Sequence, residues 1–395
     1  MYVYADNAAT TALSETALAA MTPFFREVYG NPSSLHTPGQ EAAQALLQAR
    51  QTVARCLNAG TKEIYFNGGG SEGDNQAIVS AARLGAAKGK RHIVSTAFEH
   101  HAVLHTLTDL EKQGFEITLL PVHENGVVRL EEVAAAIRED TALVTVMLAN
   151  NEIGTVQPIR EIAALCRERG VLCHTDAVQA VGHIPVDVQA LGVDMLTLSA
   201  HKFHGPKGVG ALYVRKGVPL VSFIHGGQQE RGKRAGTENI PAIVGLAAAL
   251  EEAAEHLSGS VPRVTAMRER LIAGLSEIPH SRLNGDREQR LPGTVNFCFE
   301  GIEGESLLLL LDAKGVAASS GSACTSGSLD PSHVLLALGL PHDVAHGSLR
   351  LSIDDNNTPE EIEHILASVP PVVEYLRQMS PIWDDLEKGK KPFLL

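Results

Sequence analysis

The sequence predicts an α/β protein in which a large, mainly parallel β-sheet is accompanied by a smaller α+β domain. Between about residues 60 and 215, short β-rich runs alternate with segments whose apolar residues recur at helical spacing. This alternation is typical of parallel sheets, because successive parallel strands need a crossover helix between them. Beyond residue 258 the pattern changes to helices mixed with isolated strands, which is typical of an α+β arrangement.

Seven runs are predicted to be strands of one sheet. They cover residues 63–66, 92–95, 116–121, 142–148, 171–175, 195–199 and 210–214. The segments between them carry the apolar periodicity of amphipathic helices. These helices are predicted at residues 74–87, 102–113, 130–139 and 159–169.

The length of 395 residues is enough for about two or three domains of ~150 residues each. We expect a large domain over residues 14–258 and a small domain, carrying Cys324, formed by residues 1–13 and 259–395. A helix at 240–257 is followed by Ser-Gly-Ser-Val-Pro262, which predicts a hinge between the two domains. The small domain is predicted to hold helices at 264–275, 305–314, 331–337 and 359–376 and strands at 294–299, 315–318 and 348–353.

The composition excludes several classes of protein. With 44% hydrophobic and 20% charged residues, the chain does not resemble disordered, collagen-like or disulfide-rich proteins. The net charge of −13 repels phosphate backbones, and only 4% of the residues are aromatic, so we expect no nucleic-acid partner. No basic stretch followed by an apolar run opens the sequence, and no apolar run approaches ~18 residues. We therefore expect no membrane contact and a cytoplasmic location.

A glycine-rich stretch, Phe66-Asn-Gly-Gly-Gly-Ser-Glu-Gly-Asp-Asn75, lies between a predicted strand and a predicted helix. Free backbone N–H groups and the helix dipole favour a phosphate at such a place. Two alternatives stay open. A tight turn that needs glycine would give the same pattern. The stretch also fits the G-x-G-x-x-G spacing of nicotinamide-binding sites, through Gly68, Gly70 and Gly73, with a late acidic residue at Glu99.

Two polar residues follow predicted strands. Lys202 comes just after the run at 195–199, and Asp176 directly follows the run at 171–175. A pyridoxal cofactor needs a lysine for its aldehyde and a carboxylate that keeps its ring nitrogen protonated, and these two residues supply both. The alternatives are a surface lysine and an aspartate that caps a helix.

The five cysteines contain no C-x-x-C pair, so reduced thiols are expected. Cys324 lies in the Ser/Gly-rich stretch 319–328, between the predicted strand at 315–318 and a helix predicted to begin at Asp330-Pro331. Such a position suits a nucleophilic thiol that must meet a substrate and then a partner protein. The alternative, a buried structural thiol, fits the cysteines on apolar elements, Cys166, Cys173 and Cys298.

Long motifs extend this interpretation over nearly the whole chain. They are Tyr4-Ala-Asp-Asn-Ala-Ala-Thr-Thr11, Gly30-Asn-Pro-Ser-Ser34, Glu99-His-His101, Asn150-Asn-Glu-Ile-Gly154, His174-Thr-Asp-Ala-Val-Gln-Ala-Val-Gly182, Ser199-Ala-His-Lys202, Arg234-Ala-Gly-Thr-Glu-Asn239 and Ser319-Ser-Gly-Ser-Ala-Cys-Thr-Ser-Gly-Ser328. With these motifs the sequence resembles the cysteine desulfurases of the NifS type, in the class V aminotransferase branch of pyridoxal-phosphate enzymes. The resemblance implies the fold type I of that branch, which is also the fold of aspartate aminotransferase.

The resemblance also implies a role for each matching residue. Lys202 would bind the aldehyde of pyridoxal 5′-phosphate and shuttle the substrate Cα proton. Asp176 would pair with the ring nitrogen, and His100 would stack on the ring and act as a catalytic acid or base. The phenolic-oxygen side of the ring would be contacted by Asn151 and Gln179. The phosphate would be held by Gly70, Ser71, Ser199 and His201.

The remaining implied roles concern the substrate and the partners. Thr237 would reach the phosphate from a second subunit, so a homodimer is expected. Arg350 would clamp the carboxylate of L-cysteine, with Asn151 also touching the substrate. Cys324 would take the sulfur as a persulfide, releasing L-alanine, and pass it to an iron–sulfur scaffold or another acceptor protein. Its only expected part in metal binding is as a transient ligand of an iron–sulfur cluster. The motif around Thr237 leans towards the nitrogen-fixation subgroup.

Three positions depart from the family pattern. Ser71 stands where threonine is usual, Ala200 where glycine is usual and Gly73 where serine is usual. Ser71 keeps the hydroxyl, whereas the other two alter local geometry. Other functions stay open: an aminotransferase or a selenocysteine enzyme would share Lys202 and Asp176, a dehydrogenase would use the glycine loop, and a sulfur carrier would need only Cys324.

Overall fold

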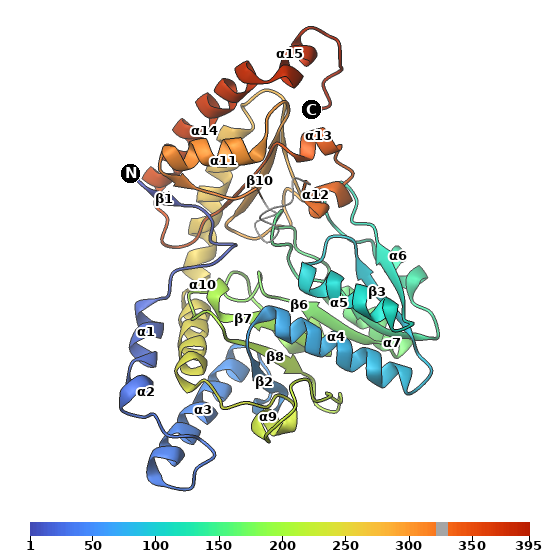
Figure 1. Ribbon diagram of the computed structural model, residues 1–395, viewed down its shortest axis with the longest axis vertical. Helices are drawn as coiled ribbons and strands as arrows, with labels where there is room; N and C mark the ends of the chain where they lie inside the picture. Colours follow the sequence, from blue (N-terminus) through green and yellow to red (C-terminus); the bar gives the residue numbers. More distant parts are fainter. Residues whose placement is uncertain (321–330) are drawn as a thin grey trace.

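The structure is a computed structural model of the chain that describes residues 1–320 and 331–395 (Figure 1). Cys324 lies in the segment 321–330 and therefore outside the described residues. A seven-stranded sheet covered by helices forms the lower part of Figure 1, and a smaller sheet with its own helices forms the upper part. Among the helices of the described residues, none has the length and apolar character needed to cross a bilayer.

The large sheet contains all seven predicted strands in the spatial order β2-β8-β7-β6-β5-β3-β4. Their bounds are β2 (Ile64–Asn67), β3 (His92–Thr96), β4 (Glu116–Leu120), β5 (Thr141–Thr145), β6 (Leu172–Asp176), β7 (Met195–Ser199) and β8 (Gly210–Val214). The sheet is mainly parallel, as predicted, but β8 runs antiparallel to both of its neighbours, β2 and β7. The short connection 200–209 explains this reversal, because a parallel pair needs a crossover of a dozen or more residues.

Helices bury the large sheet on both faces. On one face, α4 (Gly70–Ala86) and α5 (His101–Lys112) share a buried cluster with Met195. The other large cluster joins Leu196 to residues of α3 (Thr37–Cys56), α7 (Ile159–Arg169) and α10 (Ile240–Leu275). The side chains of the adjacent residues Met195 and Leu196 thus pack on opposite faces of the sheet, as the pleat of a strand requires. The shorter helices of this part are α1 (Glu15–Met21), α2 (Pro23–Arg26), α6 (Leu130–Ala136), α8 (Val188–Leu191) and α9 (Gln229–Gly232).

The smaller part has a three-stranded antiparallel sheet in the order β12-β10-β9. Its strands are β9 (Ser281–Leu283), β10 (Thr294–Phe299) and β12 (Ser348–Ser352), and beside them β1 (Val3–Tyr4) pairs in parallel with β11 (Val316–Ala317). Its helices are α11 (Gly304–Ala313), α12 (His333–Ala337), α13 (His342–Ala345), α14 (Pro359–Met379) and α15 (Pro381–Glu387). Val3 and Ala5 are buried in the same cluster as residues of β10, β12 and α14. This contact supports placing the N-terminal residues with the small domain, and the exact domain boundaries stay a prediction.

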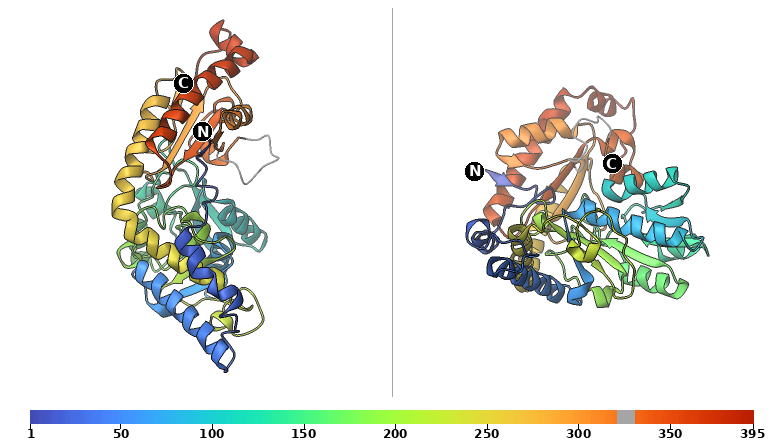
Figure 2. Two further views of the ribbon diagram at one scale, coloured as in Figure 1. Left: turned by 90° about the vertical axis from the view of Figure 1, so that its left-hand side faces the viewer. Right: turned by 60° about the horizontal axis from the view of Figure 1, so that its bottom comes forward.

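The predicted hinge at Pro262 is wrong. One helix, α10, runs for 36 residues through Pro262 and replaces the two predicted helices. Proline removes one helical hydrogen bond, but packing outweighs that loss because both halves of the helix are anchored. The first half is buried through Leu246 and Leu250, and the second half through Leu271 and Leu275 in the cluster of the small sheet. Figure 2 shows α10 running along one edge of the molecule from one part to the other.

Two predicted helix starts also differ from the structure. Helix α4 begins at Gly70, four residues before the predicted start, so the first turn of the helix is itself made of the glycine-rich stretch. Helix α12 begins at His333, and Ser332 caps it through its side chain. The predicted start of that helix at Asp330-Pro331 is therefore wrong, because the N-cap serine satisfies the first backbone N–H groups and fixes the boundary.

Candidate functional site

The carboxyl ends of β6 and β7 meet the start of α4 at one edge of the large sheet, the usual ligand-binding edge of α/β sheets. Asp176 is the last residue of β6 and Ser199 the last residue of β7. A Cβ atom added at Gly70 would lie 3.7 Å from Cβ of Ser199 and only 2.8 Å from Val178. The glycine therefore lets the helix start pack closely against both strand ends. The structure brings together the predicted phosphate loop, Asp176 and Ser199.

Lys202 is placed beside these strand ends by a single turn, η2 (Ala200–Lys202), that follows β7. Its Nζ donates hydrogen bonds to the carbonyl oxygens of Ala8 and Ala9, at 2.5 and 2.8 Å. Its backbone carbonyl lies 2.8 Å from Nε2 of His183. The lysine is thus held at the edge of the site by backbone carbonyls of the N-terminal motif, rather than solvated on the surface as the alternative supposed.

Asp176 is a buried carboxylate, 6% exposed. Its Oδ1 accepts a hydrogen bond of 2.9 Å from the N–H of Val178. Burial raises the pKa of Asp176 to about 6, while that hydrogen bond and the nearby charge of Lys202 act in the opposite direction. The group is therefore mostly ionised at neutral pH in a place sheltered from water, as a partner for a protonated ring nitrogen must be.

Among the described residues, the start of α4 has no side-chain cap, so its first backbone N–H groups can face an anion. Its N-cap is Gly69, with φ of 139°, a conformation that favours glycine. The helix is 17 residues long, so its dipole adds to the attraction. Ser71 is exposed in this turn, and Ser199 is buried beneath it. Gly70, Ser71 and Ser199 therefore lie where the sequence predicts a phosphate site.

His100 caps the helix that borders the site. Its Nδ1 accepts a hydrogen bond of 3.1 Å from the N–H of Ala102, so the proton of the neutral ring resides on Nε2. Burial and, to a smaller extent, the charge of Lys202 lower the pKa of His100 to about 4. His100 is consequently neutral at physiological pH, and its free Nε2–H can donate a hydrogen bond.

Three other predicted contacts surround the same edge. His201 has its Nδ1 3.1 Å from the hydroxyl of Thr10, and burial lowers its pKa to about 4, so it is neutral. Gln179 donates to the carbonyl of Ala8 at 3.0 Å, the carbonyl that also accepts from Lys202. Oδ1 of Asn151 is buried without a hydrogen-bond partner among the described residues.

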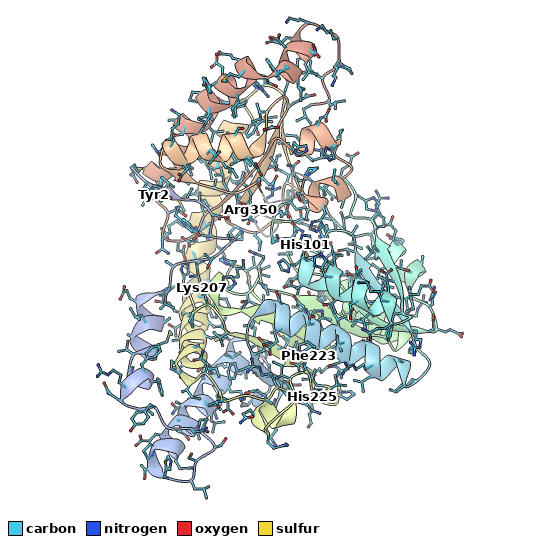
Figure 3. The ribbon with its side chains drawn as sticks, in the orientation of Figure 1. Tyr2, His101, Lys207, Phe223, His225 and Arg350 are labelled. Carbon is cyan, nitrogen blue, oxygen red and sulfur yellow. The ribbon has the colours of Figure 1, made fainter. Side chains whose placement is uncertain are left out.

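Arg350 approaches the site from the small sheet, where it is 2% exposed. One guanidinium nitrogen donates to Oδ1 of Asp6 at 2.8 Å and another to the carbonyl of Asn151 at 3.1 Å. Its Nε is buried without a partner among the described residues. Figure 3 shows Arg350 on the small-sheet side and His101, at the start of α5, on the large-sheet side. The guanidinium is thus close to the predicted site but already shares its charge with Asp6.

Thr237 precedes α10 and lines a small cavity of about 160 Å³ together with Asn67 and Gly68. In the same wall, Arg234 forms an ion pair with Glu72 of α4 at 2.8 Å. The segment that carries Thr237 is therefore fixed next to the phosphate loop. The contribution of Thr237 to a second subunit stays a prediction.

The structure explains two of the departures from the family pattern. A Cβ atom added at Gly73 would lie 2.6 Å from Cγ2 of Thr197, so α4 packs on β7 too closely for serine. Ala200 is fully buried, and a Cβ atom at Gly205 would lie 2.7 Å from that of Ala200. Alanine at position 200 is accommodated because position 205 has no side chain.

Histidines gather beside the site. The rings of His101 and His105 have centroids 5.0 Å apart, and those of His101 and His333 are 4.6 Å apart. Within residues 1–320 and 331–395, no group of three or more His, Cys, Asp or Glu side chains could hold a metal ion. Cys324, the proposed transient cluster ligand, lies outside the described residues. The three cysteines predicted to be structural are indeed buried, namely Cys166, Cys173 and Cys298.

Sequence reasoning missed two residues that shape the site. Asp74 is 1% exposed and lies against Asp176, although it was predicted only as the start of a helix. His333 reaches from α12 to the carbonyl of Glu99, with Nε2 2.9 Å from that oxygen. The feature of the sequence that could have identified Asp74 is its position, as an acidic residue, on the apolar, sheet-facing side of a helix.

These residues fit pyridoxal 5′-phosphate. Asp176 offers a buried carboxylate to the ring nitrogen, Lys202 an amine to the aldehyde, and the start of α4 an anion cradle to the phosphate. Oδ1 of Asn151 and Nε of Arg350 are buried without a partner among the described residues and are therefore available to a bound group, because unsatisfied buried polar atoms are unfavourable.

The nicotinamide alternative does not fit the same geometry. A dinucleotide-binding unit starts from a strand inside a parallel sheet. Here the strand before the glycine loop, β2, is at the edge of the sheet, and its neighbour β8 is antiparallel to it. Glu99, the late acidic residue, is fully buried and bonded to Thr96 and to the N–H of Met147. It cannot reach a ribose.

Comparison with known proteins identifies similar chains. Residues 3–365 match the family model for Aminotransferase class-V. Cysteine desulfurase IscS of Clostridium botulinum is 52% identical over 392 residues, which cover 98% of this chain and 98% of that protein. Cysteine desulfurase IscS of Methanosarcina thermophila is 53% identical over 380 residues, which cover 96% of this chain and 94% of the relative.

Solved structures are also similar over most of the chain. A structure described as a NifS-like protein has a TM-score of 0.90 and 40% identity, and the match covers 95% of this chain and 100% of that one. A structure of SspA in complex with cysteine has a TM-score of 0.78 and 36% identity, with coverage of 90% and 99%.

Proposed function

Because this chain belongs to the aminotransferase class-V family, we propose that it is a cysteine desulfurase, a pyridoxal 5′-phosphate enzyme that converts L-cysteine to L-alanine and keeps the sulfur as a persulfide on Cys324. The observation that carries the proposal is the convergence of Lys202, Asp176 and the start of α4 at one edge of the sheet. Relatives named as cysteine desulfurases are 52% and 53% identical to this chain over nearly its whole length, and they support the choice of reaction.

Pyridoxal phosphate, when bound, supplies an aldehyde for an amine and a ring that withdraws electrons from the substrate Cα. The chain supplies the rest. Asp176 keeps a proton at the ring nitrogen, and the N–H groups at the start of α4 hold the phosphate. Lys202 Nζ removes and returns the Cα proton, for which it must leave the carbonyls of Ala8 and Ala9. His100 is neutral, and its Nε2–H would donate a hydrogen bond to the bound cofactor.

Arg350 is positioned to bind the substrate carboxylate. Its Nε has no partner among the described residues, so one donor of the guanidinium is available. The hydrogen bond to Asp6 fixes the guanidinium in place. The positive charge of the guanidinium can then be shared between Asp6 and the carboxylate of the substrate.

The ends of the segment that carries Cys324 are anchored at the site. Ser319 exchanges backbone hydrogen bonds with Arg350, at 2.6 and 3.2 Å. On the other side, His333 contacts the carbonyl of Glu99, the residue before His100. Both attachment points therefore lie beside residues of the site. In the proposed step, Sγ of Cys324 forms a bond to the substrate sulfur while the bond from that sulfur to carbon breaks, and the protonated carbon fragment leaves as alanine.

The persulfide is then passed to an iron–sulfur scaffold or another acceptor protein in the cytoplasm, with nitrogenase maturation as one such pathway. A thiol-to-thiol transfer of this kind needs no further cofactor, because an acceptor thiolate attacks the outer sulfur and Cys324 leaves as thiolate. The enzyme works as a homodimer in which Thr237 serves the phosphate site of the partner.

Replacing Cys324 with alanine tests the function. The variant is expected to bind pyridoxal phosphate with the visible spectrum of the wild type and still to respond spectrally to L-cysteine, but to form no cysteine-dependent sulfide. The measurement combines absorbance spectra with sulfide and alanine assays. Cys56→Ala serves as the control, because Cys56 is a half-buried thiol at the end of α3, far from Cys324 in the sequence. A Cys324→Ala enzyme that releases sulfide and alanine at the wild-type rate would identify a different lyase of the same family.

A mixed-dimer experiment tests Thr237. Lys202→Ala and Thr237→Ala chains carrying different tags are co-expressed, and the mixed dimer is purified. If Thr237 acts in the partner subunit, the site that keeps its own Lys202 receives an intact threonine and works as in the wild type. If Thr237 acts within its own chain, neither site is complete, and the cofactor affinity stays about tenfold weaker, as for loss of a phosphate hydrogen bond. A monomeric active enzyme in sedimentation would also contradict the prediction.

A further inference from the structure

A row of buried polar side chains leads across the large sheet to Asp176. The hydroxyl of Thr145 in β5 lies 2.8 Å from Nδ1 of His174 in β6, and Nε2 of His174 lies 3.0 Å from the hydroxyl of Thr197 in β7. Thr197 is paired with Asp176 across the two strands. The carboxyl group of Asp74, from the first turns of α4, lies against both Thr197 and Asp176. All five side chains are at most 6% exposed.

Asp74 and Asp176 cannot both be charged in this environment. Two carboxyl groups in contact and out of water hold one proton between them. The pKa of Asp74 lies well above its ordinary value, first through burial and then through the charge of Asp176. The pKa of Asp176 is raised only to about 6, because the N–H of Val178 and the charge of Lys202 favour its ionised form. The shared proton therefore resides on Asp74.

The groups around the pair give Asp74 no counter-charge. His174 is the nearest basic side chain, with Nε2 3.7 Å from Oδ1 of Asp74. Burial lowers the pKa of His174 to about 3, so its ring is neutral. The other acid nearby, Glu99, has its pKa raised to about 8 by burial and is mostly protonated. Lys202 is close to Asp176, and its positive charge stabilises the ionised form of Asp176, the carboxyl group assigned to the cofactor.

The hydrogen bonds of the row then all point the same way, from Thr145 towards Asp176. Thr145 donates to Nδ1 of His174, and Nε2–H of His174 donates to the oxygen of Thr197. The hydroxyl of Thr197 is left to donate to Asp74, and the acid proton of Asp74 to Asp176. Oδ1 of Asp74 receives no hydrogen bond from any described donor, which agrees with a protonated carboxyl group.

We propose that Asp74 is a positioning residue that donates a hydrogen bond from its protonated carboxyl group to Asp176 and so keeps Asp176 charged and fixed in orientation for the ring nitrogen of the cofactor. The proposal rests on the proposed function only in placing pyridoxal phosphate at Asp176. Loss of the donor raises the pKa of Asp176, because hydrogen bonding to a carboxylate favours its charged form. Cofactor binding then weakens as the pH falls through a midpoint that is higher than in the wild type.

Two variants of Asp74 separate its proton donation from its volume. Asp74→Asn keeps a donor and cannot ionise, and is expected to bind pyridoxal phosphate as the wild type does. Asp74→Leu keeps the number and branching of the side-chain heavy atoms without a donor, and is expected to bind the cofactor about tenfold or more weakly, with the midpoint of the pH titration moved upwards. The measurements are equilibrium titrations with pyridoxal phosphate over a pH series, without cysteine, and thermal unfolding of each variant.

The direction of the pH shift decides between the alternatives. A downward shift in Asp74→Leu would mean that Asp74 carries a charge in the wild type and would overturn the proposal. Equal cofactor affinity in the leucine variant and the wild type would overturn it as well. If the leucine variant does not fold, the infrared difference spectrum between wild type and Asp74→Asn without cofactor still tests it, since a protonated carboxylic acid must be present in the wild type at pH 8. A wild type that binds the cofactor but makes no alanine from cysteine would refute the proposed function and leave this inference standing.

Discussion

Lys202→Ala is expected to lower the rate of alanine formation from L-cysteine by about 10²- to 10⁴-fold through loss of proton transfer alone. The variant loses the amine that the structure places at the carboxyl edge of the sheet beside Asp176, and with it the proposed covalent link to the cofactor aldehyde. The visible absorbance band of that link is expected to disappear, while non-covalent cofactor remains held at the start of α4.

Lys207→Ala is the matched control, because Lys207 lies five positions later in the same connection and is exposed (Figure 3). It is expected to keep the wild-type spectrum and rate. Unfolding curves of both variants separate chemistry from stability, since Lys202 also ties Ala8 and Ala9 to the large sheet. A Lys202→Ala enzyme that retains the absorbance band and the rate would show that another amine performs the reaction.

Asp176→Asn is expected to weaken pyridoxal phosphate binding by about 10- to 100-fold, the effect of losing a hydrogen bond to a charged group. Asparagine keeps the shape of the side chain but removes the charge that holds a proton at the ring nitrogen. Alanine formation is expected to fall further than the affinity, because the unprotonated ring withdraws electrons less well. The measurement is cofactor titration followed by turnover at saturating cofactor.

The wild type is expected to show the matching pH dependence. Burial raises the pKa of Asp176 to about 6, so the charged form that binds the ring nitrogen is present above that pH and is lost as the pH falls through it. Asp176→Asn cannot titrate, and its cofactor affinity should no longer change in that range. The control is Asp194→Asn, a buried aspartate at the opposite end of the neighbouring strand, paired with Arg215. If Asp194→Asn weakened cofactor binding as much as Asp176→Asn, the effect would be general and the assigned role of Asp176 would be wrong.

The role of His100 is narrower than the sequence alone suggests. A histidine near the reacting atoms is expected to titrate near neutrality. In the structure, burial and the neighbouring Lys202 lower its pKa to about 4, and its Nδ1 is used to cap α5. His100 is therefore a hydrogen-bond donor at physiological pH, and its protonation is opposed first by burial and then by the charge of Lys202.

Local pattern was enough to predict the seven strands of the large sheet and the edge at which the glycine-rich stretch, Asp176 and Lys202 meet. Strand and helix periods are properties of neighbouring residues, and the carboxyl ends of parallel strands share one edge whatever the rest of the chain does. Burial of Cys166, Cys173 and Cys298 follows from the same local information, since each lies in an apolar run.

Only the tertiary structure decided features that depend on residues far apart in the chain. Pro262 indicates a break locally, yet α10 continues because its two halves are buried in separate cores. The ion pair of Arg350 with Asp6 joins positions 344 residues apart, and no local pattern encodes it. The contact of Asp74 with Asp176 likewise exists only because glycine at position 73 lets α4 approach β7. Side-chain ionisation follows such contacts, because burial and neighbouring charges set a pKa, and both are properties of the folded chain.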